Sequence, residues 1–160
     1  MDEYRIYLDT SVVNFLYAED APQERDITKK LWKILRTKKY RVYISDRVLA
    51  EISRADTETR ERLVNSLNEI EYIILESSKE SETLTRLYIE NKIVKEKDID
   101  DARHIAITTV NYIGAIVSWN FKHIVNLKTI YGINGVNRMH GYPGIEIVTP
   151  EYFIEEDIRK

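Results

Sequence analysis

The sequence contains no cysteine among its 160 residues. That absence excludes disulfide bonds, a thiolate nucleophile and zinc sites built on cysteine. The sequence also has no apolar run near the roughly 20 residues that a membrane-spanning helix needs. Its first residues, MDEYRIYLD, are acidic and lack the basic and apolar start of a signal peptide. We therefore expect a cytoplasmic protein with no membrane partner.

An overall excess of basic residues is also missing, since the formal net charge is −3. This charge argues against a protein that coats nucleic acid through bulk electrostatics. The distribution is uneven, however, because residues 25–41 hold eight Lys or Arg and one Asp. A local patch matters more than the total charge in attracting a phosphate backbone, so this stretch is a candidate nucleic-acid surface. An ordinary solvated helix face, with Trp32 packed inwards, is an equal alternative.

Glycine and proline are scarce, with five and three residues respectively. Four of the five glycines fall within residues 132–144, which predicts an irregular loop there. The sequence shows no repeat and no linker, and 43% of its residues are hydrophobic. We expect one domain over residues 1–160, with enough apolar content for a true core.

Short apolar runs alternate with helical patterns along the whole chain. The runs are continuous, as is typical of strands buried on both faces of a parallel sheet, and they span residues 5–8, 41–45, 72–75, 115–119 and 145–148. The spacing of apolar residues predicts helices within 26–38, 47–54, 58–70, 77–92 and 98–113. The alternation predicts an α/β fold, a three-layer α/β/α sandwich around a mainly parallel five-stranded sheet.

Polar residues mark the expected helix ends. Thr57 and Asp98 are candidate N-caps, and Ser77 with Glu80 fits a capping box. Gly114 stands where a glycine commonly ends a helix in the left-handed conformation.

Four polar residues follow or lie near the apolar runs, and they are Asp9, Glu51, Asp101 and Asn120. Ligands bind at the carboxyl edge of open α/β sheets, where strand-terminal residues meet. Acids gathered there repel one another unless a hard divalent cation neutralises them, and Mg²⁺ or Mn²⁺ prefers such oxygen ligands. The pattern predicts metal-dependent chemistry on an anionic substrate, and a phosphodiester is the substrate that we expect.

Each of these residues has a structural alternative. Asp9 could cap the next helix, Glu51 could lie at the edge of a buried face, and Asn120 could end a turn. Asp98, Asp100 and Asp101 all lie at a helix start, where each acid stabilises the helix by about 0.3–1 kcal/mol. Three acids within four residues exceed what capping requires.

Helical geometry separates the two adjacent acids of this group. Asp101 shares a face with Ile105 and Thr108, so we expect Asp101 to point inwards and Asp100 to be solvated or supporting.

The histidines show no metal-ligand spacing with one another. His104 lies within a helical pattern, and we expect a structural role for it. His123 and Lys122 follow Asn120 closely, so they could reach a phosphate, although an exposed turn is the simpler expectation.

Four motifs in order give the chain a resemblance to PIN domains, the metal-dependent ribonuclease domains of VapC-type toxins. They are LDTSVVNFL, ISDRVLAEI, DDARHIAIT and VSWNFKHI, and the resemblance covers about residues 4–153. It implies a PIN-like fold in which Asp9, Glu51 and Asp101 hold Mg²⁺ or Mn²⁺. Thr10 or Ser11 resembles the hydroxyl that orients the first carboxylate, and Ser45 resembles its counterpart after the second strand.

The chain departs from the common family pattern at Asn120, where many members carry a fourth Asp. Asparagine offers a neutral oxygen or a hydrogen bond, so one negative charge is lost. A second, weakly held metal is thereby put in doubt, while a site for a single metal is consistent with the remaining acids.

The resemblance implies hydrolysis of RNA phosphodiester bonds by an endoribonuclease. The expected partners are RNA, an antitoxin protein if the chain is a toxin, and a second copy of the chain. Candidate RNA-binding residues are Lys29, Lys30, Lys33, Arg36 and Lys122. A housekeeping RNA-processing enzyme, a catalytically weak module that binds RNA or protein, and a DNA-directed nuclease are the alternatives that the sequence leaves open.

Overall fold

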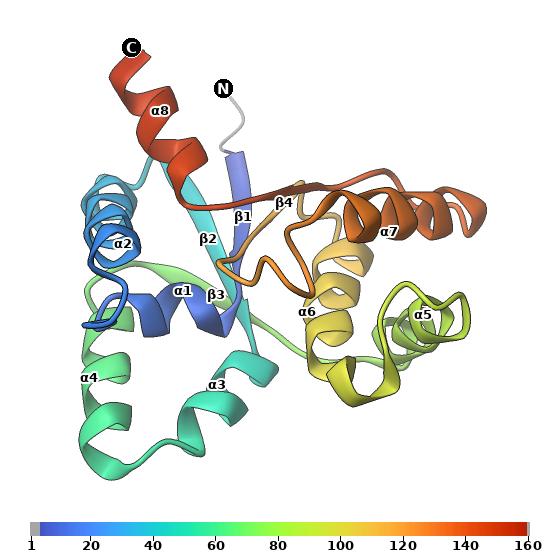
Figure 1. Ribbon diagram of the computed structural model, residues 1–160, viewed down its shortest axis with the longest axis horizontal. Coiled ribbons are helices and arrows are strands. Elements are labelled where there is room, and N and C mark those ends of the chain that lie inside the picture. Colours follow the sequence, from blue (N-terminus) through green and yellow to red (C-terminus); the bar gives the residue numbers. More distant parts are fainter. Residues whose placement is uncertain (1–3, 160) are drawn as a thin grey trace.

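The computed structural model describes residues 4–159, and a parallel sheet runs through its centre (Figure 1). Within these residues the sheet has five strands in the order β3-β2-β1-β4-β5, and every neighbouring pair is parallel. The strands are Tyr4–Leu8 (β1), Tyr40–Ser45 (β2), Tyr72–Leu75 (β3), Ala115–Val117 (β4) and Glu146–Val148 (β5). The predicted strands and the α/β fold class are confirmed.

Helices cover both faces of the sheet. In Figure 1, α1, α2 and α4 lie to the left of the strands, and α5, α6 and α7 lie to the right. The α-helices are Thr10–Phe15 (α1), Pro22–Arg36 (α2), Asp46–Ser53 (α3), Thr57–Leu67 (α4), Lys79–Glu90 (α5), Ile99–Val110 (α6), Leu127–Met139 (α7) and Glu151–Arg159 (α8). A short 3-10 helix, Glu96–Asp98 (η1), leads into α6. No helix of residues 4–159 is long and apolar enough to span a membrane.

The central strand β1 brings two chain segments together at the carboxyl edge of the sheet. Leu8 pairs with Val117 in the register of β1 with β4, and the Asp9 amide donates to the Val117 carbonyl at 3.2 Å. The residues that follow both strands therefore emerge next to each other. This register is what places Asp9 beside the segment after β4.

The edge strand β3 departs from the sequence prediction of strands buried on both faces. Ile73 and Ile74 are 44% and 45% exposed. Only β2 pairs with β3, since β3 stands at one end of the sheet. An apolar run cannot by itself distinguish a central strand from an edge strand, so the prediction that β3 is buried on both faces is wrong.

The irregular loop predicted over residues 132–144 is wrong for most of its length, because α7 continues to Met139. A Cβ atom on Gly132 would lie 2.5 Å from the Ile93 side chain, so this glycine allows α7 to pack closely. Only Gly141, beyond the helix, has a positive φ among the glycines of this stretch. One glycine of this stretch, Gly132, lets the helix lie against Ile93, and another, Gly141, allows a turn with positive φ.

The start of α5 also differs from the prediction. Ser78 is the N-cap and forms a capping box with Ser81, so the predicted pair of Ser77 and Glu80 is wrong. Ser77 instead donates from its amide and its hydroxyl to the carboxylate of Asp46, at 2.9 and 2.8 Å. Ser77 and Ser78 could each cap this helix. Because Ser77 is bonded to the distant Asp46, Ser78 is the cap.

Two further helix ends are shifted by one or two residues. Asp56, rather than Thr57, caps α4. Asp98 does occupy the N-cap position of α6, but its side chain makes no capping hydrogen bond. After α6 the left-handed conformation falls on Tyr112, with φ of 56°, and not on Gly114.

A buried amide anchors α7 to the core, which generates a stability prediction. Asn137 accepts from the Tyr88 hydroxyl at 2.5 Å and donates to Thr109 Oγ1 at 3.2 Å. Asn137→Ala should lower the free energy of unfolding by about 2–3 kcal/mol, because both partners lose a bond where water cannot replace it. Urea unfolding followed by circular dichroism measures this. Met139→Ala, at a side chain that is 77% exposed on the same helix, should change stability by less than about 0.5 kcal/mol. Equal effects of the two changes would contradict the anchoring role.

Candidate active site

Asp9 is buried at the carboxyl end of β1, where it is also the N-cap of α1. Both of its carboxylate oxygens accept short hydrogen bonds. Ser11 Oγ donates to Oδ1 and Ser118 Oγ donates to Oδ2, each at 2.5 Å. Burial raises the pKa of Asp9, and the nearby His104 and the hydroxyl bonds only partly offset that rise. The carboxylate is therefore oriented from two segments, and holding its charge is costly.

Glu51 approaches from α3, and its two oxygens have different partners. Oε1 lies 3.0 Å from His104 Nε2, and Oε2 accepts a hydrogen bond from the Thr10 hydroxyl. Burial raises the pKa of Glu51, but the bonds from His104 and Thr10 outweigh it and leave the pKa below its ordinary value. Glu51 is thus the acid of the site that most readily stays ionised.

A buried chain of hydrogen bonds stands behind Glu51. His104 Nδ1 lies 2.6 Å from the Tyr7 hydroxyl, which lies 2.7 Å from Ser45 Oγ. When Nε2–H of a neutral imidazole points at Glu51, Nδ1 accepts from Tyr7. Burial lowers the pKa of His104, but the contact with Glu51 outweighs this effect and the pKa is raised overall. The chain fixes the imidazole, which in turn fixes the Glu51 carboxylate.

Asp101 lies in the first turn of α6, facing the segment after β4. Asn120 Nδ2 donates to Asp101 Oδ1 at 3.2 Å, and Asn120 Oδ1 accepts from the His123 amide at 2.9 Å. Burial raises the pKa of Asp101 to about 6; His123 and His104 oppose the rise, while Asp9 and Asp98 add to it. Asn120 orients the carboxylate without adding a further negative charge.

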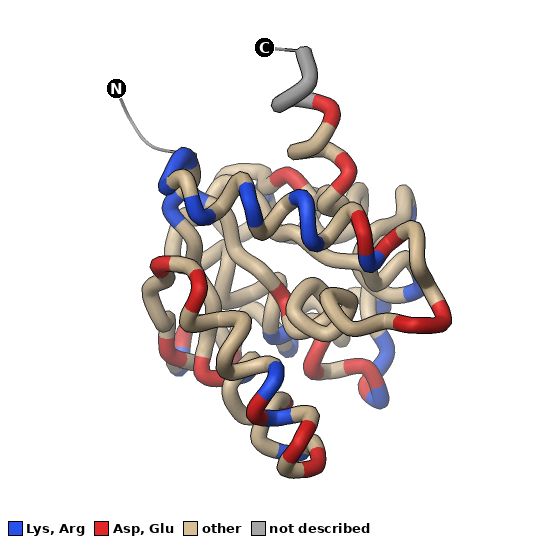
Figure 2. The backbone as a smooth tube through the Cα atoms, turned by 90° about the vertical axis from the view of Figure 1, so that its left-hand side faces the viewer, with Lys and Arg blue, Asp and Glu red and all other residues tan. Residues whose placement is uncertain are grey.

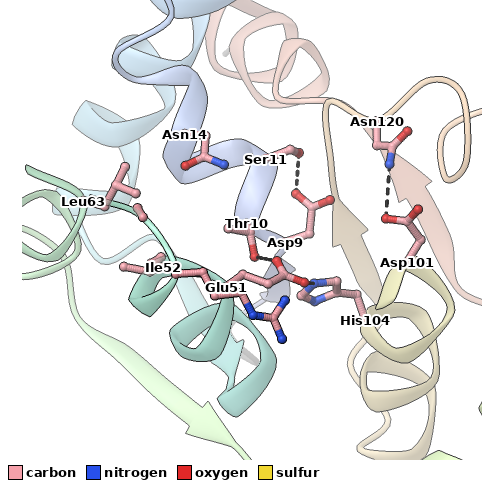
Figure 3. Close-up of a pocket in the computed structure, with 12 residues that line it drawn as sticks. Asp9, Thr10, Ser11, Asn14, Glu51, Ile52, Leu63, Asp101, His104 and Asn120 are labelled. Carbon is pink, nitrogen blue, oxygen red and sulfur yellow. Dashed lines mark hydrogen bonds and ion pairs between the residues drawn. The ribbon is translucent and has the colours of Figure 1, made fainter. Parts of the chain in front are cut away.

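These side chains line one cleft of about 400 Å³ at the carboxyl edge of the sheet (Figure 3). In Figure 3 the residues from α1, α3, α6 and the segment after β4 face one another across it. The structure brings six of the predicted site residues together there: Asp9, Thr10, Ser11, Glu51, Asp101 and Asn120. The structure also separates the roles expected of the two hydroxyls, since Ser11 contacts Asp9 and Thr10 contacts Glu51.

The two remaining supporting residues do not line this cleft. Ser45 is buried behind it, where it contacts Tyr7 and caps α3. Asp100 pairs with Arg47 at 3.1 Å and with Arg103 at 3.0 Å. Burial raises the pKa of Asp100, but the two guanidinium groups together outweigh burial and hold the pKa below its ordinary value. Asp100 therefore faces cations of its own chain.

Sequence reasoning missed the position of His104, which lines the cleft and contacts Glu51 directly. The signal was available, because His104 follows Asp101 by three residues and the two share a helical face. Asn14 and Arg54 also line the cleft and carried no signal in the sequence.

The donor set fits a divalent cation in its chemistry, since the acids supply the oxygen ligands that Mg²⁺ and Mn²⁺ prefer. Burial is the main cause that raises the pKa of two of the three cleft acids, Asp9 and Asp101, and a bound cation would favour their ionised forms. Among the side chains described over residues 4–155, one group of three potential ligands has all its ligand atoms within 4.8 Å of one another, and it consists of Asp98, Asp101 and His123. Asp9 and Glu51 line the same cleft as Asp101 but are not part of that tight group.

The basic stretch lies mostly on α2, along which Lys and Arg recur in Figure 2. Trp32 is 1% exposed, and its indole N–H donates to the Ser66 carbonyl at 2.9 Å, so the inward alternative holds for this side chain. The candidate RNA-binding residues are all exposed, although Arg36 also pairs with Glu69 at 2.7 Å; they are Lys29, Lys30, Lys33, Arg36 and Lys122.

One hydrogen bond connects this helix to the cleft. The indole N–H of Trp119, the neighbour of Asn120, donates to Thr28 Oγ1 of α2 at 2.8 Å.

Solved structures share this fold. The crystal structure of VapBC2 from Rickettsia felis, bound to a DNA fragment from their promoter, has a chain that is 15% identical, with a TM-score of 0.59 and coverage of 91% of this chain and 98% of that one. PAE2754 from Pyrobaculum aerophilum is 11% identical, with a TM-score of 0.52 and coverage of 98% of this chain and 91% of that one. No family model and no curated protein sequence matches the chain. The class that these findings define is an α/β protein with a PIN-like fold, as the resemblance implied.

The raised pKa of Asp101 predicts a pH-dependent gain in stability for Asp101→Asn. The folded state holds the proton more tightly than the unfolded state, so this carboxyl destabilises the fold as pH rises from about 4 to about 6. Without divalent cations, Asp101→Asn should be more stable than the wild type at pH 7.5 by about 1–2 kcal/mol. This is less than the pKa shift alone would give, because solvent partly screens the carboxylate. Urea unfolding in EDTA at pH 4 and pH 7.5 measures the difference, which should shrink at pH 4. A variant less stable than the wild type at pH 7.5 would refute this explanation.

Proposed function

We propose that this chain is a metal-dependent endoribonuclease, a hydrolase of RNA phosphodiester bonds. The observation that supports this best is the convergence of Asp9, Glu51 and Asp101 in one cleft, with burial raising the pKa of two of them. Acids held ionised at the cost of stability are typical of functional sites rather than of structural ones.

Asp9, Glu51 and Asp101 would hold Mg²⁺ or Mn²⁺. Bound there, the cation would supply a water of lowered pKa and stabilise the charge that develops on the phosphoryl oxygens. The residues around the acids have positioning roles. Ser11 and Ser118 orient Asp9, while Thr10 and His104 orient Glu51 and keep it ionised. Asn120 orients Asp101.

The biological setting that we propose is a toxin–antitoxin pair in the cytoplasm. It rests on the likeness in fold to the VapBC2 structure, which is bound to a DNA fragment from the promoter of that pair. The partners would be an antitoxin protein and RNA, with a homodimer of the chain as the assembled form. A housekeeping role in RNA processing uses the same chemistry and is distinguished by expression, since only a toxin should arrest growth when its antitoxin is absent.

A second candidate function is a catalytically weak PIN-like module that binds RNA or a protein partner. The observation that favours it is Asn120, whose neutral amide stands where many PIN domains carry a fourth carboxylate. The two candidate functions predict different results. A weak module would bind RNA but would not cleave it, whichever divalent cation is added.

Cleavage of a mixed-sequence single-stranded RNA tests the nuclease proposal. The wild type should cleave with Mn²⁺ or Mg²⁺, and Asp101→Asn should lower the rate at least 100-fold, because it removes a charge that the cation needs. Glu58→Gln, which changes an exposed acid of α4, is the matched control and should keep the wild-type rate.

Equal rates in wild type and Asp101→Asn would point to a contaminating nuclease, and binding without cleavage would favour the weak module. Faster cleavage of a DNA oligonucleotide than of RNA would instead assign the site to DNA.

The lysines of α2 generate a separate prediction about RNA affinity. Lys29, Lys30 and Lys33 are exposed on that helix, and each phosphate contact contributes about 0.7 to the salt dependence of single-strand binding. Replacing all three with alanine should weaken RNA binding at 50 mM salt and reduce the slope of log K against log [salt] by about 2. Fluorescence anisotropy with the Asp101→Asn protein measures binding without cleavage. An unchanged slope would mean that α2 is an ordinary solvated face.

A further inference from the structure

We propose that Asp98, Asp101 and His123 form a cation site of their own beside the cleft, and that it prefers a first-row transition cation such as Mn²⁺ over Mg²⁺. This proposal rests on the proposed function and deepens it. It adds two metal ligands that do not line the cleft, Asp98 and His123, and it assigns a metal preference.

The three residues converge from different segments. Asp98 ends η1, Asp101 lies one helical turn later in α6, and His123 lies in the turn after β4. One ligand atom from each lies within 4.8 Å of the others. His123 Nδ1 and Asp98 Oδ2 are 3.5 Å apart, and both side chains are mostly shielded from solvent. Three donors at this spacing can surround a single ion.

An independent observation at Asp98 also points to a ligand. Its Oδ2 is buried and accepts no hydrogen bond, and its nearest charged group is the His123 imidazole at 3.5 Å. Among the side chains described over residues 4–155, only one other buried polar atom, Arg47 Nε, lacks a hydrogen bond. Nearly all buried polar atoms in folded proteins have a hydrogen bond, and a buried anionic oxygen that lacks one is costly unless a cation lies close to it. Asp98 stands at the N-cap position of α6 without making the capping bond. Its carboxylate is therefore left for another positive partner.

Asn120 joins this group to the cleft. Its amide nitrogen donates to Asp101 and its amide oxygen accepts from the His123 backbone, so one side chain orients two of the three proposed ligands. Asp98 and Asp101 together carry two negative charges, which a divalent cation would balance. Where many PIN domains carry a fourth Asp, this chain has Asn120. In this proposal the Asp98 carboxylate and the His123 imidazole supply the ligands in its place.

The imidazole determines the metal preference. Histidine nitrogen suits Mn²⁺, Fe²⁺, Co²⁺ and Zn²⁺ better than Mg²⁺, which prefers oxygen ligands and keeps much of its water. Asp98 and His123 do not line the cleft, whereas Asp101 belongs to both groups. A cation bound here would thus contact the proposed active site through Asp101 alone.

The test measures binding rather than activity. Calorimetric titration of the intact protein with Mn²⁺ and separately with Mg²⁺ should show tighter binding of Mn²⁺. His123→Gln should weaken Mn²⁺ binding at least tenfold and Mg²⁺ binding less than threefold. Asp98→Asn, which removes a charge, should weaken both. His140→Gln, at an exposed histidine outside the group, is the matched control and should bind as the wild type does.

Magnetic resonance of the three histidine rings locates the ion independently of any substitution. Substoichiometric Mn²⁺, which is paramagnetic, should broaden the His123 signals before those of His104 and His140. Wild-type affinity in both His123→Gln and Asp98→Asn, or broadening of His104 while His123 stays sharp, would overturn the proposal. Either result would reduce the group to an ion pair between Asp98 and His123.

RNA cleavage measured on the same samples separates the two proposals. Mn²⁺ binding through His123 without cleavage would retain this site and remove the nuclease. Cleavage with no contribution of His123 or Asp98 to Mn²⁺ binding would retain the nuclease and remove this site.

Discussion

Asp9 holds a carboxylate at a position where only 4% of the residue is exposed, and the centre of the molecule is arranged around that charge. The strand β1 ends there, α1 begins there, and the segment after β4 donates to the same carboxylate through Ser118. Burial nevertheless raises its pKa, so hydrogen bonds alone do not compensate the lost hydration. A cation is the partner that would complete this arrangement.

The other charges of the cleft are stabilised by unequal means. Glu51 is held by a buried chain through His104, Tyr7 and Ser45, which connects α3, α6, β1 and β2. The contacts with His104 and Thr10 outweigh burial and lower the pKa of Glu51. Asp101 receives only the amide of Asn120 from within the cleft, and its pKa rises to about 6. The two acids therefore differ in what keeps them ionised. The protein's own hydrogen bonds keep Glu51 ionised, whereas ionisation of Asp101 near neutral pH would gain most from a bound cation.

The sequence predicts the strands and the convergence of the acids well, because a continuous apolar run followed by a polar residue is a local signal. It fails where the deciding contact is distant. At position 132 of α7 a side chain would collide with Ile93, so glycine fits there although it does not mark a loop. Ser77 does not cap α5, because its amide and hydroxyl donate to Asp46. For His104 the sequence predicts only a structural role, because its partners Tyr7 and Glu51 lie 97 and 53 residues away along the chain. The sequence around Asp98 likewise gives no sign that Oδ2 is buried without a hydrogen bond and that His123, 25 residues later, lies 3.5 Å from it.

We propose that the carboxylates of the cleft bind a divalent cation. A crystal structure of the protein soaked in Mn²⁺, with anomalous diffraction recorded at the manganese edge, tests it most directly. We expect an anomalous peak within coordination distance of Asp101, the acid shared by the cleft and the neighbouring group. A map with no peak there, and with Asp101 bonded only to Asn120 at saturating Mn²⁺, would contradict the claim.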